Sequence, residues 1–213
     1  MRRLPVYLLL DTSGSMSGEP IEALKTGVQT LVSALRTDPY ALETAFLSII
    51  TFASLAKQVC PLTELATFQV PSAIAASGTT ALGEALGLLA DCIETEVAKT
   101  TSEAKGDWKP IVFIMTDGSP TDDWQKGVNR LKKVRTGVVV ACAAGRAADT
   151  SVLKQLADVV VQLDTADENT IKSFFKWATA SIVSGSQKVD SGQKEVTGLG
   201  DLPPPPPEVN VVL

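Results

Sequence analysis

Oxygen-bearing side chains occupy alternate positions of one short segment and recur in a second one. The segment DTSGS places Asp11, Ser13 and Ser15 two residues apart, and TDGS places Asp117 directly after an apolar run. Side chains two residues apart in an extended or looping backbone can point the same way, so one carboxylate and two hydroxyls converge. Carboxylate and hydroxyl oxygens are hard ligands suited to Mg²⁺ or Mn²⁺. The two segments therefore predict a divalent-cation site if the fold brings them together.

The elements around these segments predict how they would meet. Apolar runs of strand length alternate with segments of helical period, which predicts a doubly wound α/β fold with a mostly parallel six-stranded sheet and helices on both faces. We expect strands at residues 5–10, 45–52, 57–62, 110–116, 138–143 and 159–163, and helices at residues 19–38, after residue 80, and at 122–135, 150–157 and 168–184. In such a sheet ligands bind beyond the carboxyl ends of the strands, where the strand order reverses. Asp11 and Asp117 meet there if their strands flank that point, and Thr79 or Thr80 could add a hydroxyl.

Each motif also has a purely structural explanation. Asp-Thr-Ser-Gly is good turn chemistry, and Ser13 or Ser15 could cap the helix that begins at residue 19. Thr80 could likewise cap its own helix, and the glycine after Asp117 could simply mark a turn. Two strand-end carboxylates combined with hydroxyls at fixed spacing favour the metal site over these separate explanations.

The composition argues against several other classes of site. The 213 residues include no histidine, which excludes Ser-His-Asp and Cys-His catalysis and a His-ligated zinc site. The 24 acidic and 19 basic side chains give a formal charge of -5, which argues against a nucleic-acid-binding surface. Cys60, Cys92 and Cys142 are widely spaced in apolar runs and predict reduced core thiols. The first apolar run is too short for a secretory signal or a membrane span, so we expect a cytoplasmic protein.

Taken together, the DTSGS segment, a threonine before a helix and the TDG segment resemble the metal-ion-dependent adhesion site (MIDAS) of von Willebrand factor type A (VWA) domains. The resemblance covers residues 1–184. The family's spacing places its threonine five residues before the small residue of the Ala85-Leu86 pair, which selects Thr80. The family usually has a second glycine where this chain has Thr79, so the choice between Thr79 and Thr80 stays open.

Longer segments carry a narrower resemblance. The segments RRLPVYLLLDTSGSM, GEPI, AKQVCPLTEL and VFIMTDGSPTDDW are similar to TerY-type proteins of bacterial tellurite-resistance and stress-response operons. This similarity implies a scaffold in such a system. Its implied partners are other tellurium-resistance proteins and an associated kinase and phosphatase pair, with no nucleic acid and no insertion into a membrane.

The VWA resemblance implies a binding module that is not an enzyme. In such sites Ser13, Ser15 and Thr80 contact the metal directly or through water, and Asp11 and Asp117 act partly through waters. The implied cofactor is Mg²⁺, with Mn²⁺ or Ca²⁺ as alternatives. Neutral hydroxyl ligands leave the ion under-neutralised, so a Glu or Asp of a protein partner is attracted as the last ligand.

Two other functions stay open on the residues alone. A Mg-dependent phosphohydrolase of haloacid-dehalogenase (HAD) type also begins with an Asp after its first strand. Such an enzyme needs a second carboxylate where this chain has Ser13, which argues against it. A purely structural Rossmann-like protein is the other alternative. The loop GSMSG matches neither of the common glycine-rich phosphate-binding motifs.

The composition changes after residue 184. Gly, Ser, Lys and Gln dominate residues 185–201, and five prolines at 203–207 precede the apolar end VNVVL. We therefore divide the chain into a VWA domain at 1–184 and a linker with an irregular proline-rich tail at 185–213. The tail is either a solvated linker or a polyproline II segment that delivers the apolar end to a sheet edge or a partner groove.

Two further features lie near helix ends. The basic cluster of Lys132, Lys133 and Arg135 is expected to be a solvated helix end. Trp124 follows Asp117 closely, so it either borders the metal site or packs at the start of a helix.

Overall fold

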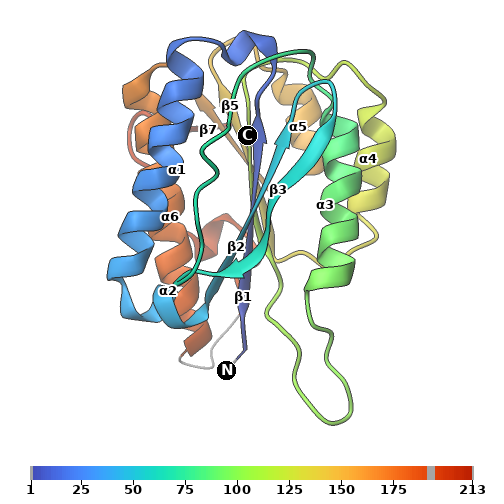
Figure 1. The fold of residues 1–213 in the computed structure, drawn as a ribbon, viewed down its shortest axis with the longest axis vertical. Coiled ribbons are helices and arrows are strands. Elements are labelled where there is room, and N and C mark those ends of the chain that lie inside the picture. Colours follow the sequence, from blue (N-terminus) through green and yellow to red (C-terminus); the bar gives the residue numbers. More distant parts are fainter. Residues whose placement is uncertain (1, 191–194, 213) are drawn as a thin grey trace.

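A computed structural model describes residues 2–190 and 195–212. Its centre is one seven-stranded sheet with the strand order β3-β2-β1-β4-β5-β6-β7 (Figure 1). The strands are β1 (Leu4–Asp11), β2 (Ala45–Phe52), β3 (Ala56–Glu64), β4 (Ile111–Thr116), β5 (Val138–Ala144), β6 (Val159–Leu163) and β7 (Asn210–Val211). The five inner strands run parallel, and the edge strands β3 and β7 are antiparallel to their neighbours. The predicted α/β fold is confirmed, but the prediction of six strands was one short because β7 was missed.

The inner strands are apolar throughout because helices cover both faces of the sheet. Every residue of β1, β4 and β5 is buried. The edge strand β3 is half-buried and carries polar side chains, as expected of a strand that solvent reaches. The predicted hairpin between residues 45–52 and 57–62 is confirmed by the antiparallel pairing of β2 with β3.

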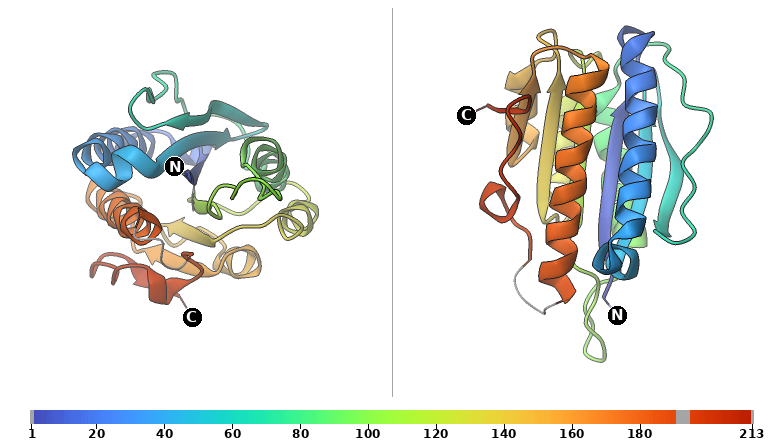
Figure 2. Two further views of the ribbon diagram at one scale, coloured as in Figure 1. Left: turned by 90° about the horizontal axis from the view of Figure 1, so that it is seen from below. Right: turned by 90° about the vertical axis from the view of Figure 1, so that its left-hand side faces the viewer.

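In the described part of the chain, six α-helices form the two outer layers, and the view along the sheet shows these layers (Figure 2). One face carries α1 (Glu19–Thr37), α2 (Pro39–Thr44) and α6 (Glu168–Asp190), and the other carries α3 (Leu82–Glu96), α4 (Trp124–Leu131) and α5 (Thr150–Leu156). Two separate apolar cores fill the spaces between the sheet and these layers. In α1 the buried side chains recur every three or four residues, as the sequence pattern predicts.

Two helices end elsewhere than predicted. The helix α4 spans eight residues rather than 122–135, because Asp123 caps it and the chain turns away after Leu131. The helix α6 continues past residue 184 to Asp190. The helix packs closely on β4 at this point, since a Cβ on Gly185 would lie 3.2 Å from Cδ1 of Ile111. Tertiary packing therefore overrides the weak helix propensity of this segment.

The described part of the tail packs on the edge of the sheet. Pairing of β7 with β6 adds the seventh strand, so the apolar end reaches a sheet edge. The indole nitrogen of Trp177 donates a hydrogen bond of 2.8 Å to the carbonyl oxygen of Pro203. Val196, Leu202 and Val209 are buried in the core beneath α6. The division of the chain at residue 184 stays a prediction, and residues 191–194 lie outside the described ranges.

Within residues 2–190 and 195–212, no helix is both long and apolar enough to cross a membrane.

Candidate metal centre

The two aspartates lie at the carboxyl ends of adjacent strands, where the strand order reverses, with Asp11 the last residue of β1 and Asp117 directly after β4. From β1 the chain builds β2 and β3 on one side, and then crosses to β4 and the remaining strands on the other. The strands β1 and β4 pair in parallel, with Leu10 opposite Met115. Asp11 and Asp117 therefore leave the same edge of the sheet side by side, as the topology rule for open parallel sheets predicts.

Hydrogen bonds fix the carboxylate of Asp11 at the end of β1. Its Oδ1 accepts from the amide of Ser13 at 2.8 Å, and its Oδ2 accepts from the hydroxyl of Thr116 at 2.5 Å. The amide of Thr12 donates to the carbonyl oxygen of Phe52 at 2.8 Å, which ties the loop to β2. Asp11 is 0% exposed, so its charge lies in a protected position.

A chain of hydroxyl contacts connects the loop after β1 to the loop after β4. The Ser13 and Ser15 hydroxyl oxygens lie 3.0 Å apart, and the Ser15 hydroxyl donates to Oδ1 of Asp117 at 2.7 Å. Ser13 and Asp117 are buried, whereas Ser15 is exposed at the rim. The structure thus brings four of the five predicted site residues into one hydrogen-bonded group.

The neighbouring residues Thr79 and Thr80, the two candidates for the fifth position, face opposite ways. The exposed Thr79 turns away, since its amide and hydroxyl contact the hydroxyl of Ser54 at 3.1 and 3.3 Å. The buried Thr80 faces the other way, and its Oγ1 lies 3.8 Å from the position that a Cβ on Gly118 would take. Gly78 makes this turn possible, because its φ is +74° and a Cβ there would lie 2.3 Å from the Ser54 hydroxyl oxygen. Of the two threonines, Thr80 is therefore the one whose hydroxyl faces the loop after β4.

Burial also sets the electrostatics of the group. Loss of solvent raises the pKa of the Asp11 carboxyl above its ordinary value, and the nearby charge of Asp117 adds to this shift. Hydrogen bonds from Ser13 and Thr116 act in the opposite direction because they stabilise the carboxylate. Two carboxylates in a largely buried site repel each other, and a cation between them relieves this repulsion.

The donor set fits a hard divalent cation. Two carboxylates and three hydroxyls offer only oxygen atoms. Among the described residues, no three side chains of His, Cys, Asp or Glu come together in a way that could hold a metal. Any metal at this edge of the sheet therefore depends on the serine and threonine hydroxyls, which sequence spacing identified.

Three supporting residues were missed by the sequence analysis. Thr116 was assigned only to its strand, although its hydroxyl holds Asp11. Thr121 accepts a hydrogen bond from the Thr80 amide at 3.1 Å and donates its own amide to the Thr80 carbonyl at 2.9 Å. The Asp122 carboxylate accepts from the amides of Gly83 and Glu84 in the first turn of α3, at 3.0 and 2.8 Å. The sequence shows that these residues carry hydroxyl and carboxylate groups. The groups to which they hydrogen-bond, however, lie 38–105 residues away in the sequence.

The remaining candidates have ordinary structural roles. Trp124 begins α4, is half-buried and packs against the apolar core beneath α3 and α4. The three cysteines are free thiols, of which Cys92 and Cys142 are buried and Cys60 is half-buried. Burial raises the pKa of Cys92 to about 11 and raises that of Cys142 further.

Comparisons with solved structures identify the fold. A VWA structure from Catenulispora acidiphila is 17% identical with a TM-score of 0.65, over 86% of this chain and 43% of its own. The open conformation of the pilus adhesin SpaC from Lactobacillus rhamnosus GG is 15% identical with a TM-score of 0.67. The match covers 86% of this chain and 30% of SpaC. A third structure is proximal thread matrix protein 1 of the mussel byssus with a zinc-occupied MIDAS motif. It is 19% identical with a TM-score of 0.58, and the match covers 84% of this chain and 46% of the mussel protein. This chain spans less than half of these three proteins, and no curated protein sequence matches it significantly.

The family model named von Willebrand factor type A domain matches residues 6–176. The match includes both loops of the candidate metal centre and runs from β1 into α6. Members of this family are commonly metal-dependent modules of protein interaction. The chain belongs to the von Willebrand factor type A domain family.

Proposed function

We propose that this protein is a metal-dependent protein-interaction module whose MIDAS binds a carboxylate of a partner through a divalent cation. The metal site consists of Asp11, Ser13, Ser15, Thr80 and Asp117. The observation that carries this proposal is the hydrogen-bonded chain from Ser13 through Ser15 to Asp117, which joins the loops after β1 and β4.

The residues of the proposed metal site have different roles. Asp11, held by Thr116 and by the Ser13 amide, keeps a fixed negative charge beneath the site. The hydroxyls of Ser13, Ser15 and Thr80 offer neutral oxygen ligands. Ser15 is exposed, so this side of the site is open to a partner.

When bound, the cation supplies the positive charge that an acidic partner residue recognises. This role matters because the chain carries a formal charge of -5 and would otherwise repel such a partner. We propose Mg²⁺ as the natural ion, with Mn²⁺ or Ca²⁺ as alternatives, because all five ligands are hard oxygen donors. The zinc-occupied MIDAS of the mussel protein supports a divalent cation in this fold.

We further propose that the protein is not an enzyme. The acid required by HAD-type phosphohydrolases would stand at residue 13, where the structure has a serine whose hydroxyl contacts Ser15. The narrower proposal is a cytoplasmic scaffold of a bacterial tellurite-resistance and stress-response system. It rests on the TerY-like segments alone, and its partners would be other tellurium-resistance proteins with a kinase and a phosphatase.

Calorimetric titration with Mg²⁺ and with Mn²⁺ tests the metal site. Wild type should bind one ion, and Asp11→Ala and Ser15→Ala should bind it at least tenfold more weakly or not at all, because each removes an oxygen from the site. Asp123→Asn is the matched control. It removes a charge near the same edge, while asparagine still caps α4, so its metal affinity should match wild type.

A pull-down with and without EDTA tests the interaction. Capture of the tellurium-resistance proteins should require both the metal and Asp11. Identical partner lists for wild type and Asp11→Ala, in either condition, would contradict a metal-gated interaction. Release of phosphate from a generic phosphate ester would instead support the enzyme.

A further inference from the structure

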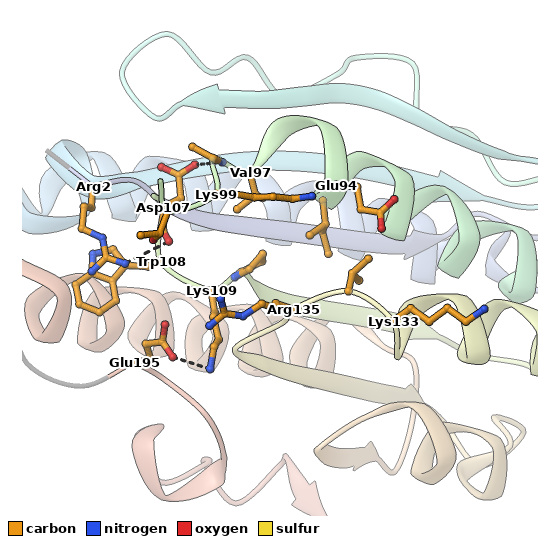
Figure 3. Close-up of a pocket in the computed structure, with 15 residues that line it drawn as sticks. Arg2, Glu94, Val97, Lys99, Asp107, Trp108, Lys109, Lys133, Arg135 and Glu195 are labelled. Carbon is orange, nitrogen blue, oxygen red and sulfur yellow. Dashed lines mark hydrogen bonds and ion pairs between the residues drawn. The ribbon is translucent and has the colours of Figure 1, made fainter. Parts of the chain in front are cut away.

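A cavity of about 500 Å³ lies at the other end of the sheet from the metal centre. Its lining comes from the segments that precede β1 and β4, the carboxyl-terminal end of α3, and the turn after α4 (Figure 3). Asp11 and Asp117 instead lie at the carboxyl ends of β1 and β4. The cavity is therefore separate from the site proposed above, and its function does not depend on that proposal.

Basic side chains outnumber acidic ones in this cavity. The five cations are Arg2, Lys99, Lys109, Lys133 and Arg135, and the three carboxylates are Glu94, Asp107 and Glu195. This excess of positive charge occurs in a chain whose formal charge is -5. The predicted solvated cluster at residues 132–135 thus contributes Lys133 and Arg135 to a concave site.

Each of the three carboxylates already has a cationic partner. Asp107 pairs with Arg3 at 2.5 Å, Glu94 with Arg130 at 2.6 Å, and Glu195 with Lys109 at 2.6 Å. Arg3 and Arg130 are not part of the lining, so they neutralise two of the acids from outside. Arg130 and, more weakly, Lys99 lower the pKa of Glu94, so this carboxylate lies under the influence of two cations.

Four cations are left without a carboxylate within ion-pair distance among the described residues. The side chains of Lys99, Lys133 and Arg135 form no hydrogen bond or ion pair within residues 2–190 and 195–212. Arg2 is held in place by backbone carbonyls, with Nε 2.7 Å from the oxygen of Gly106. Its guanidinium also lies 3.7 Å from the ring centre of Trp108, a cation–π contact that orients it.

The cavity also offers apolar surface. Ile93, Val97, Pro110 and Val134 line it together with Trp108. Small-molecule sites commonly have volumes of about 300–1,000 Å³ and combine such apolar surface with a few placed polar groups. An inorganic anion alone would leave the apolar part of this cavity unused.

We propose that this cavity binds a small organic molecule that carries two or more phosphate groups beside a flat or apolar group, in the chemical class of nucleoside diphosphates. Five lining cations against three carboxylates that are already paired match a multivalent anion, and Arg2 and Arg135 offer guanidinium donors to its phosphates. The apolar lining accommodates the uncharged part of the ligand.

Calorimetric titration with ADP in EDTA tests this assignment. Without free divalent ions, phosphate cannot bind through the metal centre. Wild type should bind one ADP, with an affinity that falls as salt is raised, because the cations of the cavity face solvent. Asp11→Ala should bind ADP as wild type does, since Asp11 lies at the other end of the sheet.

Two neighbouring lysines provide a matched pair of variants. Lys133→Glu should weaken ADP binding about tenfold or more, because it replaces a positive charge of the cavity lining with a negative one. Lys132 is also exposed but does not line the cavity, so Lys132→Glu should change the affinity by less than about threefold at moderate salt. Circular dichroism and thermal unfolding should show both variants folded as wild type.

Inorganic pyrophosphate separates the phosphate part of the ligand from the rest. ADP should bind at least tenfold more tightly than pyrophosphate because only ADP contacts the apolar lining. Equal affinities would overturn the assignment to this class of ligand. Absence of ADP binding, equal losses in Lys132→Glu and Lys133→Glu, or loss of binding in Asp11→Ala would each overturn the proposed site.

Discussion

Thr116→Val probes the hydrogen bond that holds the buried carboxylate of Asp11. Valine keeps the shape of threonine but cannot donate to Oδ2 of Asp11, which now accepts from the hydroxyl at 2.5 Å. Both residues are at most 2% exposed, so water cannot replace the lost donor. A hydrogen bond to a charged group contributes about 1.5–3 kcal/mol, and we expect the free energy of unfolding to fall by that amount.

Urea unfolding in EDTA measures this loss, with Thr12→Val as the matched control. The Thr12 hydroxyl donates to the neutral carbonyl of Phe52 at 3.2 Å at the same edge of the sheet, and a neutral hydrogen bond contributes only about 0.5–1.5 kcal/mol. Calorimetry should also show weaker Mg²⁺ binding in Thr116→Val, by roughly three- to tenfold, because its carboxylate is less well oriented. Thr12→Val should retain the affinity of wild type.

If Thr116→Val unfolds at the same urea concentration as wild type and binds Mg²⁺ equally well, this bond does not position Asp11. A loss equal to that of Thr12→Val would contradict the claim that the acceptor is charged.

Three further substitutions test contacts between α3 and α4, at the start of α3, and between α6 and the tail, and urea unfolding measures the first two. Gly127→Ala would place a Cβ 2.3 Å from the carbonyl oxygen of Gly83, so α3 and α4 must separate at a cost of about 1–3 kcal/mol; unchanged stability would disprove the close contact. Asp122→Ala removes the acceptor for two amides in the first turn of α3 and should cost about 0.5–2 kcal/mol, and no loss would argue against this cap. Trp177→Phe removes the hydrogen bond to the Pro203 carbonyl and should accelerate proteolysis of the tail, followed by mass spectrometry. Cleavage at the wild-type rate would show that this bond does not hold the tail.

The sequence alone predicted those strands and helices whose signals lie within one short segment. The buried strands at residues 5–10 and 110–116 are continuous apolar runs, and the polar residue that follows each run marks the strand end. Strand–helix alternation then predicted that the two strand ends lie together. For this reason Asp11, Ser13, Ser15 and Asp117 could be grouped before the structure was known.

Other features depend on contacts between distant segments, which no local pattern reveals. Asp122 is the first residue of the helix expected at 122–135, but its carboxylate caps α3. The strand β7 has only two residues and follows a run of prolines, so its length and composition gave no strand signal. Lys133 and Arg135 resembled a solvated helix end until the fold placed Arg2 and Lys99 beside the same cavity.

We propose that the edge of the sheet beyond β1 and β4 binds a divalent cation through hydroxyl and carboxylate oxygens. Diffraction from crystals grown with Mn²⁺, recorded where manganese scatters anomalously, tests this claim most directly. We predict one strong anomalous peak bonded to oxygen atoms of the group formed by Asp11, Ser13, Ser15, Thr80 and Asp117, and no such peak in crystals of Asp11→Ala. A peak bound only elsewhere on the chain, or none in crystals of the wild type, would contradict the account.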